Sequence, residues 1–149
     1  MATRESSTLN SRRIHESSFG NAVTHYGAYT TAALANGDVV RLVRIPGGST
    51  VHKLEIINDE VDTNGAPSLV CRVGYEPVNS ADGPAADDDY FFAAGQTFLQ
   101  VAAQRTAAFA LPKKFDYDVY ITLTANAAIA TLNTAAVIGC LVLCEGNGR

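Results

Sequence analysis

The histidines and cysteines, the residues of this 149-residue chain best suited to chemistry, are few and widely separated. His15, His25 and His52 have no partner at the short spacings typical of zinc ligands. Cys140 and Cys144 lie in an apolar run, where a strand would place both side chains on one face without a nearby histidine. An odd count of three cysteines in apolar stretches is typical of small buried side chains in a reducing compartment. We therefore expect neither a disulfide framework nor a metal site.

Acidic side chains form the second group that could do chemistry. Asp82 and the run Asp87–Asp89 lie in a stretch rich in Pro, Gly and Ala, and their carboxylates could bind a hard cation. They lack the alternating order of a calcium-binding loop, so we interpret them as a solvated acidic loop. Asp116 and Asp118 alternate with Tyr120 on a predicted strand, and outward aspartates of this kind are typical of protection against edge-to-edge aggregation.

The motifs of common enzyme active sites are missing from the sequence. There is no Gly-x-Ser-x-Gly elbow, no phosphate-binding Walker loop and no Gly-x-Gly-x-x-Gly turn. No acid is paired with a base in a pattern that would place both in one cleft. We therefore expect a protein that is not an enzyme and uses no cofactor.

Composition and charge narrow the class of protein further. The net charge of −4 and the isoelectric point of about 5.2 argue against nucleic-acid binding, which favours basic surfaces. No apolar run reaches the length of a membrane span, and residues 1–13 lack the hydrophobic stretch of a secretory signal. We expect a single globular domain whose partners include neither nucleic acid nor a membrane.

Three apolar runs organise the predicted fold. Asp38–Ile45 is rich in Val, Leu and Ile, while Thr50–Ile57 and Ser68–Tyr75 alternate between two faces, which is the period of a half-buried strand. Pro46–Ser49, between the first two runs, carries a proline and two glycines and is typical of a turn. The pattern indicates an antiparallel sheet with one buried face.

Further strands are predicted on both sides of this region. We expect an edge strand at Asn21–Thr31, a strand at Phe115–Ala125, a weaker edge strand or loop at Ala127–Thr134, and a strand buried on both faces at Thr134–Cys144. Glu76–Asp89 is predicted to be a loop. Within Tyr90–Ala108 the preceding aspartates favour a short helix or turn, followed by a strand near Thr97–Val101. About eight short strands without a long helix predict an all-β sandwich or barrel.

Residues 1–20 differ from the rest of the chain, because three arginines outnumber two glutamates and apolar residues are sparse. Two interpretations are open: a frayed, flexible terminus, or an arm that becomes ordered only when it docks onto another chain. In the second interpretation the apolar anchors are Leu9, Ile14 and Phe19, and the residues that bind acidic groups of the partner are Arg4, Arg12 and Arg13.

Arginines also lie inside the predicted strands, at Arg41, Arg44 and Arg72. Such side chains commonly reach solvent or pair with local acids, here Asp38 or Glu55. They could instead serve as planar donors for carboxylates on a neighbouring subunit. We retain Arg41 and Arg44 as candidate partner-binding residues.

The order of several short motifs resembles that of the small decoration, or cement, proteins of tailed-bacteriophage heads. The resemblance covers about Tyr29–Leu143. Its motifs are a strand ending Arg-Ile-Pro-Gly-Gly (44–48), Val-x-x-Leu-x-Ile (51–56), Asp-x-Asn-x-x-Pro-x-Leu (62–69), Val-Gly-Tyr (73–75), Asp-Tyr-Phe (89–91) and Thr-Leu-Thr-Ala (122–125).

This resemblance implies an all-β jelly-roll β-sandwich in residues 21–149, preceded by the N-terminal arm of residues 1–20. It implies a structural virion protein, made in the host cytoplasm, that binds the outer capsid surface and bridges adjacent major capsid protein subunits. Such proteins act as homodimers or homotrimers at local symmetry axes. The alternative is a carbohydrate- or receptor-binding jelly-roll module of a phage particle, with a sugar platform formed by Tyr75, Asp118 and Tyr120.

Overall fold

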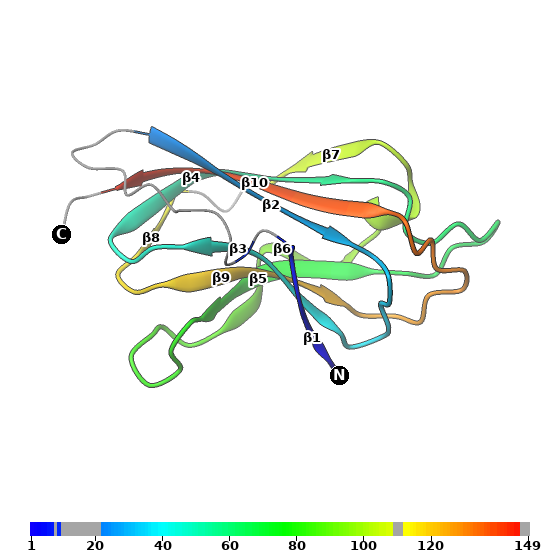
Figure 1. The fold of residues 1–149 in the computed structure, drawn as a ribbon, viewed down its shortest axis with the longest axis horizontal. Helices are drawn as coiled ribbons and strands as arrows, with labels where there is room; N and C mark the ends of the chain where they lie inside the picture. Colours follow the sequence, from blue (N-terminus) through cyan, green and yellow to red (C-terminus); the bar gives the residue numbers. More distant parts are fainter. Residues whose placement is uncertain (8, 10–21, 109–111, 147–149) are drawn as a thin grey trace.

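Alternating apolar residues pair the chain into two facing sheets in the computed structural model, which describes residues 1–7, 9, 22–108 and 112–146 (Figure 1). A single 3-10 turn, η2 (Phe98–Gln100), is the helical element of this part of the chain. The strands are β1 (Thr3–Glu5), β2 (Ala22–Thr30), β3 (Val39–Ile45), β4 (Ser49–Asn58), β5 (Cys71–Pro77), β6 (Asp87–Gln96), β7 (Gln104–Ala107), β8 (Lys113–Phe115), β9 (Val119–Ala125) and β10 (Val137–Gly146).

The strand order is that of a jelly roll. One sheet, which we call sheet A, has the order β1-β3-β9-β5-β6, and the other, sheet B, has the order β2-β10-β4-β7, with β8 also paired to β4. Eight strands form the two Greek keys of the jelly roll, while β1 and β8 are three-residue additions, and β1 pairs with β3 in parallel. The predicted all-β jelly-roll sandwich of about eight antiparallel strands is confirmed.

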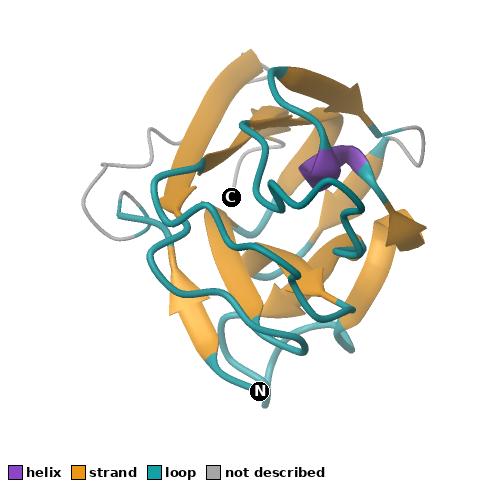
Figure 2. Ribbon diagram, turned by 90° about the vertical axis from the view of Figure 1, so that its right-hand side faces the viewer, coloured by secondary structure: helices purple, strands orange, loops and turns teal. Residues whose placement is uncertain are grey.

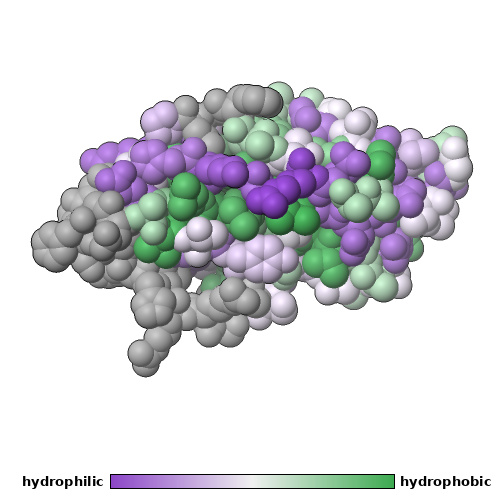
Figure 3. Space-filling view, turned by 90° about the horizontal axis from the view of Figure 1, so that it is seen from above, coloured by the Kyte–Doolittle hydropathy of each residue, from purple (hydrophilic) through white to green (hydrophobic). Residues whose placement is uncertain are grey.

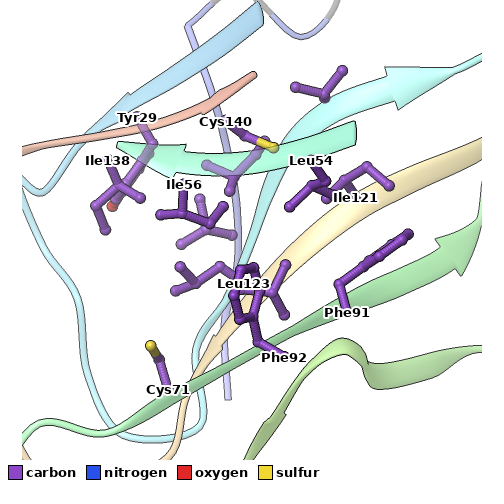
Figure 4. Close-up of a cluster of buried hydrophobic side chains, with 14 of the residues drawn as sticks. Tyr29, Leu54, Ile56, Cys71, Phe91, Phe92, Ile121, Leu123, Ile138 and Cys140 are labelled. Carbon is purple, nitrogen blue, oxygen red and sulfur yellow. The ribbon is translucent and has the colours of Figure 1, made fainter. Parts of the chain in front are cut away.

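The core lies between the sheets and is filled from their central strands (Figure 4). Ile121 and Leu123 of β9 face Leu54 and Ile56 of β4 and Ile138 of β10, and all five side chains are fully buried. Burying one such side chain contributes about 1.5–3 kcal/mol, so this layer is the main source of stability. The period of two in the sequence therefore decides which face of each strand turns inward.

The loops gather at the two ends of the sandwich. Figure 2 shows the end where η2 lies beside the loops that follow β2, β4 and β9. Asp62, in the loop after β4, is fully buried and accepts backbone N–H groups from Ser68 and Leu69 and from Ala130 and Thr131, at 2.9 to 3.3 Å. One carboxylate therefore fixes two loops that are distant in sequence.

Two of the predicted strands are confirmed, and the structure shows which strands lie beside them. The predicted edge strand at Asn21–Thr31 is β2, which lies at the edge of sheet B. The predicted interior strand at Thr134–Cys144 is β10, which lies between β2 and β4. Burial on both faces is a correction, because Leu141 and Leu143 on the outer face of β10 are only half-buried.

The region after Glu76 is corrected more extensively. Residues Asp87–Gln96 form strand β6 where we expected a loop end and a short helix, and a 3-10 turn replaces the strand expected near Thr97–Val101. Pairing with β5 and the burial of both Phe91 and Phe92 outweigh the helix preference of the preceding aspartates. The later strand of this region is β7.

The strand predicted at Phe115–Ala125 is interrupted. Residues 113–115 pair with β4 in sheet B, whereas residues 119–125 pair with β3 and β5 in sheet A. The chain changes sheets at residues 116–118, so Tyr117 is 51% exposed rather than directed into the core. Ala127–Thr134 is a loop, with one isolated bridge between Leu132 and Asp62.

Candidate functional site

The residues that the structure describes form no metal centre. In that part of the chain no three His, Cys, Asp or Glu side chains are close enough to hold a metal ion, and no helix is long and apolar enough to cross a membrane. Cys71, Cys140 and Cys144 are free thiols, and all three are buried, as predicted from their apolar surroundings. Burial raises the pKa of Cys71 and of Cys144 to about 12, and burial, with a smaller contribution from Cys144, also raises the pKa of Cys140. These thiols therefore act as hydrophobic side chains.

The outer face of sheet A carries a lattice of arginines and carboxylates. We call this the arginine face and define it by the outward side chains of β3, β9 and β5: Arg41, Arg44, Tyr120, Thr122, Thr124, Arg72 and Glu76. Arg41 donates to Glu76 through Nε and lies 3.4 Å from Glu5 through Nη1. Its guanidinium also stacks 4.7 Å from the centre of the Tyr120 ring. Three contacts therefore fix its orientation.

The neighbouring arginines are held in the same way. Arg44 Nη2 lies 2.5 Å from Asp118 Oδ2, while the other oxygen of Asp118 accepts the backbone N–H of Gly47 at 2.8 Å. Arg72 Nη2 lies 2.5 Å from Asp88 Oδ2. The Nε atoms of Arg44 and Arg72 are buried and have no hydrogen-bond partner among the described residues. The face thus combines paired charges with unsatisfied donors.

Strand β1 borders the arginine face and is fastened by Asp38. The Asp38 carboxylate accepts Arg4 Nε at 2.8 Å, the backbone N–H of Ala2 at 2.8 Å and that of Ala35 at 3.1 Å. Burial raises the pKa of Asp38, but these donors together outweigh burial and lower it. Residues 1–5 are therefore part of the sandwich, and Leu9, 6% exposed, is covered by the chain itself.

The candidate partner-binding residues divide into two sets. Arg4, Arg41 and Arg44 pair with acids of their own chain. For Arg41 and Arg44 this is the local pairing considered from the sequence, although their partners are Glu76 and Asp118 rather than Asp38 or Glu55. For Arg4 the sequence had suggested only acidic groups of a partner chain. Contact of all three with a neighbouring subunit stays a prediction, as does that of Leu9. Four further candidates lie outside the described residues: Arg12, Arg13, Ile14 and Phe19.

A groove runs across the arginine face and was not foreseen from the sequence. A cavity of about 640 Å³ has Val39, Thr122 and Thr124 among its lining residues. A second cavity of about 420 Å³, which Arg41 lines, shares Glu76, Ala85 and Ala86 with the first. We call the two together the sheet groove.

One wall of the sheet groove is the segment that enters β6. A Cβ atom on Gly74 would lie 2.0 Å from the backbone oxygen of Asp87, so this segment crosses the sheet directly over Gly74. A glycine inside a strand pattern is a signal for such a close approach. Gly74 was therefore one sign in the sequence that a segment crosses the sheet here, but the sequence did not indicate which segment.

The predicted sugar platform is not formed. Tyr75 pairs in register with Ile121 and points into the core, whereas Tyr120 pairs with Glu76 on the outer face. The Tyr75 ring is 6% exposed and makes edge contacts with the rings of Tyr90, Phe91 and Phe115. Lys113 Nζ lies over the same cluster, 4.4 Å from the centre of the Tyr90 ring. Tyr75 and Tyr120 therefore cannot contact one sugar.

On the outer face of sheet B, hydrophobic patches lie beside a hydrophilic strip (Figure 3). Leu141 and Leu143 of β10 lie half-buried beside Tyr26 of β2. On β4, Glu55 binds Arg105 Nε at 2.9 Å and Lys53 Nζ at 3.1 Å. These partners, Arg105 first, lower the pKa of Glu55 in spite of its burial. This face thus alternates apolar and charged strips.

Comparisons with known proteins place the fold among phage capsid structures. No protein-family model matches the chain, and no curated protein matches it either. A chain in the capsid of Ralstonia phage GP4 is similar over 99% of both chains, with a TM-score of 0.80 and 19% identity. A chain in the cyanophage Pam1 capsid asymmetric unit is similar over 95% of both chains, with a TM-score of 0.64 and 17% identity.

A third structure extends this similarity. In the acid-stable capsid of Helicobacter pylori bacteriophage KHP30, one chain has a TM-score of 0.60 at 18% identity, over 87% of the present chain and 92% of the other. All three matches extend over most of both chains, so they concern the whole jelly roll rather than one motif. At these identities the comparisons define the fold.

Proposed function

We propose that this chain is a structural protein of a phage virion that binds the outside of the assembled capsid and bridges adjacent major capsid protein subunits. The observation that carries the proposal is the similarity over 99% of both chains to a component of a phage capsid. The resemblance of the sequence motifs to decoration proteins agrees with it. The partners are the major capsid protein and further copies of the chain, as a homodimer or homotrimer at capsid symmetry axes.

The physical character of the molecule suits this role. Its core is closed, its three thiols are buried, and its surface arginines are held rigidly by carboxylates. A rigid body that binds several lattice contacts at once gains avidity without needing a strong individual contact. A protein that binds only the assembled shell stabilises that shell by mass action, by a few kcal/mol per site near saturation.

The arginine face and residues 1–20 are the proposed capsid-facing surface. Arg41 and Arg44 are half-exposed and fixed in direction, so a carboxylate on the capsid could be bound without ordering a long side chain. Residues of the arm would add apolar and basic contacts beside β1, which lies at the edge of the same sheet. Both sets of contacts would then act on one side of the sandwich.

The test mixes the purified protein with undecorated heads of the same phage. We expect saturable co-sedimentation at a fixed number of copies per capsid and an increase in the temperature at which the heads break open. Bovine serum albumin at the same concentration controls for trapping in the pellet. Absence of both co-sedimentation and thermal protection would overturn the proposal. Sizing chromatography of the free protein reports whether it is a dimer or a trimer.

A further inference from the structure

The sheet groove contains a buried hydroxyl group without a partner. Thr124 of β9 is only 4% exposed, lines the larger cavity, and has no hydrogen bond to Oγ1 within the described residues. Buried polar groups in native proteins are nearly always hydrogen-bonded, so each exception needs an explanation. A ligand that supplies an acceptor at this position is one such explanation.

A second unsatisfied donor lies beside the first. Arg72 of β5 is the register partner of Thr124 across the two strands, and both residues line the larger cavity. Asp88 occupies Nη2 of Arg72, which leaves the buried Nε without a partner. The outward side chains of paired residues on adjacent strands lie side by side, so the two donors can serve one acceptor or two successive ones.

The surrounding charges select a neutral acceptor. Glu76, Asp87 and Asp88 line the same cavity, and Glu76 and Asp88 already pair with Arg41 and Arg72, so no arginine charge is left uncompensated to attract a phosphate or a carboxylate. A main-chain carbonyl oxygen accepts hydrogen bonds without a net charge. The donors and the acids together therefore favour a peptide backbone over an anionic ligand.

The shape and lining of the groove favour an extended segment. The two cavities of about 640 and 420 Å³ share Glu76, Ala85 and Ala86, so they form one elongated depression rather than two separate pockets. Their apolar contributions come mostly from small side chains, including Val39, Ala85 and Pro84. Such walls leave room for alternate side chains of a strand-like peptide while its backbone meets the donors.

We propose that the sheet groove binds an extended peptide segment of the major capsid protein, whose main-chain carbonyls accept hydrogen bonds from Thr124 and Arg72. This inference rests on the proposed function, because it names the contact by which the protein recognises the capsid. It assigns recognition to the middle of the arginine face, in addition to the surface arginines and the arm.

The first test places a photoreactive amino acid at position 86, in the wall of the groove, and in a separate protein at position 93. Ala86 and Ala93 are both exposed, and Ala93 does not line either cavity. Both proteins are bound to undecorated heads, irradiated, digested and analysed by mass spectrometry. We expect a cross-link from position 86 to one segment of the major capsid protein and none to that segment from position 93.

The second test measures capsid affinity. Ala86→Trp fills the groove, and we expect at least a tenfold loss of affinity relative to Ala93→Trp. Thr124→Val keeps the β-branched shape but removes the hydroxyl, and we expect a loss of about three- to tenfold, the range for one hydrogen bond. Thr24→Val, at an exposed position of β2, is the matched control and should bind like the unmodified protein. Thermal melts confirm that each variant is folded.

The outcomes separate this inference from the proposed function. Normal capsid binding by Ala86→Trp and Thr124→Val, or a capsid-bound protein that gives no cross-link from position 86 to the major capsid protein, would overturn the groove and leave the proposed function standing. If the unmodified protein does not bind capsids, both fall. A cross-linked capsid segment together with weaker binding of both groove variants supports the inference.

Discussion

Arg4 and Asp38 join the N-terminal strand to the body of the sandwich, with 2.8 Å between Arg4 Nε and Asp38 Oδ2. The same carboxylate accepts the N–H of Ala2, and the N–H of Val39 is donated to the carbonyl of Ala2 at 2.9 Å. Strand β1 pairs with β3 over only three residues, so this polar contact is a large share of what holds it. The position of the residues that follow β1 depends on it.

Asp38→Asn is expected to release β1. The asparagine amide cannot replace a carboxylate that accepts three donors, and we expect a loss of about 3 kcal/mol in the free energy of unfolding. Urea unfolding measures this loss, and limited proteolysis should cut near residues 1–9 first. Asp116→Asn is the control, because Asp116 is highly exposed and should change stability by less than about 0.5 kcal/mol. Equal stability of the two variants would contradict the assigned role of Asp38.

Asp62 is expected to make stability depend on acid pH. Burial raises its pKa, but backbone N–H groups, that of Thr131 first, outweigh burial and lower the pKa below the usual value of 3.8. A carboxyl group with a lowered folded pKa stabilises the protein above its unfolded pKa, and this stability is lost as pH falls through the folded pKa. Unfolding free energy should therefore be constant near pH 6 and fall below about pH 4.

Asp62→Asn separates this contribution from that of other carboxylates. We expect the variant to be less stable at pH 7 by about 2–4 kcal/mol, because an amide nitrogen would face backbone donors. Its stability should also vary less between pH 5 and pH 3 than that of the unmodified protein. Chemical denaturation at several pH values measures both effects. A variant with an unchanged pH profile would show that Asp62 is not an important titrating group.

Gly27 is expected to be irreplaceable. A Cβ atom at this position would lie 1.9 Å from the backbone oxygen of Leu42, and backbone atoms cannot move aside cheaply. Gly27→Ala should cost about 3 kcal/mol or more, or prevent folding. Gly65→Ala is the matched control, since an added Cβ there meets nothing within 4 Å. Thermal melts of the two variants side by side test the contact, which predicts a large difference between them.

Arg12 and Arg13 test the arm interpretation. Replacing both by glutamate should lower capsid affinity about tenfold or more at low salt if they bind acidic groups of the capsid, and the difference should shrink as salt rises. Lys53→Glu combined with Lys114→Glu, at two exposed basic positions on β4 and β8, changes the net charge by the same amount and is the control. Co-sedimentation over a range of salt concentrations measures both variants. Equal binding of the two would assign the arm no electrostatic role.

Strands are predicted best from the sequence where one regular pattern of apolar residues runs along a strand that belongs to a single sheet. The runs that became β4 and β9 were recognised because their alternate side chains enter a single core, whereas those that became β3 and β10 were recognised by their high content of apolar residues. The same rule failed at residues 116–118, since nothing in the local pattern marks the change from sheet B to sheet A. It failed again at β6, whose pairing with β5 shifts register twice and buries the adjacent Phe91 and Phe92. Irregular pairing of this kind is decided by the partner strand.

The candidate site was less predictable than the fold. Arginines inside strands were visible in the sequence, but the carboxylates that pair with them come from distant segments. Asp118, for example, follows its partner Arg44 by 74 residues. The sheet groove depends on a segment that passes over Gly74, so it exists only in the folded chain. Gly74, a glycine within an alternating run, was the local sign of this groove. A surface that is formed by strands distant in the sequence cannot be recognised from any single stretch of it.

The central position of β10 has a consequence for how the protein is made. Strand β2, at residues 22–30, has β10 as its neighbour in sheet B, and β10 spans residues 137–146. Sheet B therefore cannot be completed until β10 has left the ribosome, and β2 has no strand partner in that sheet before then, whereas β4 can already pair with β7 and β8. Folding of this kind is slow and exposes strand edges. The edges of β2 would then be open to pairing with other chains during the interval between its synthesis and the closure of the sheet.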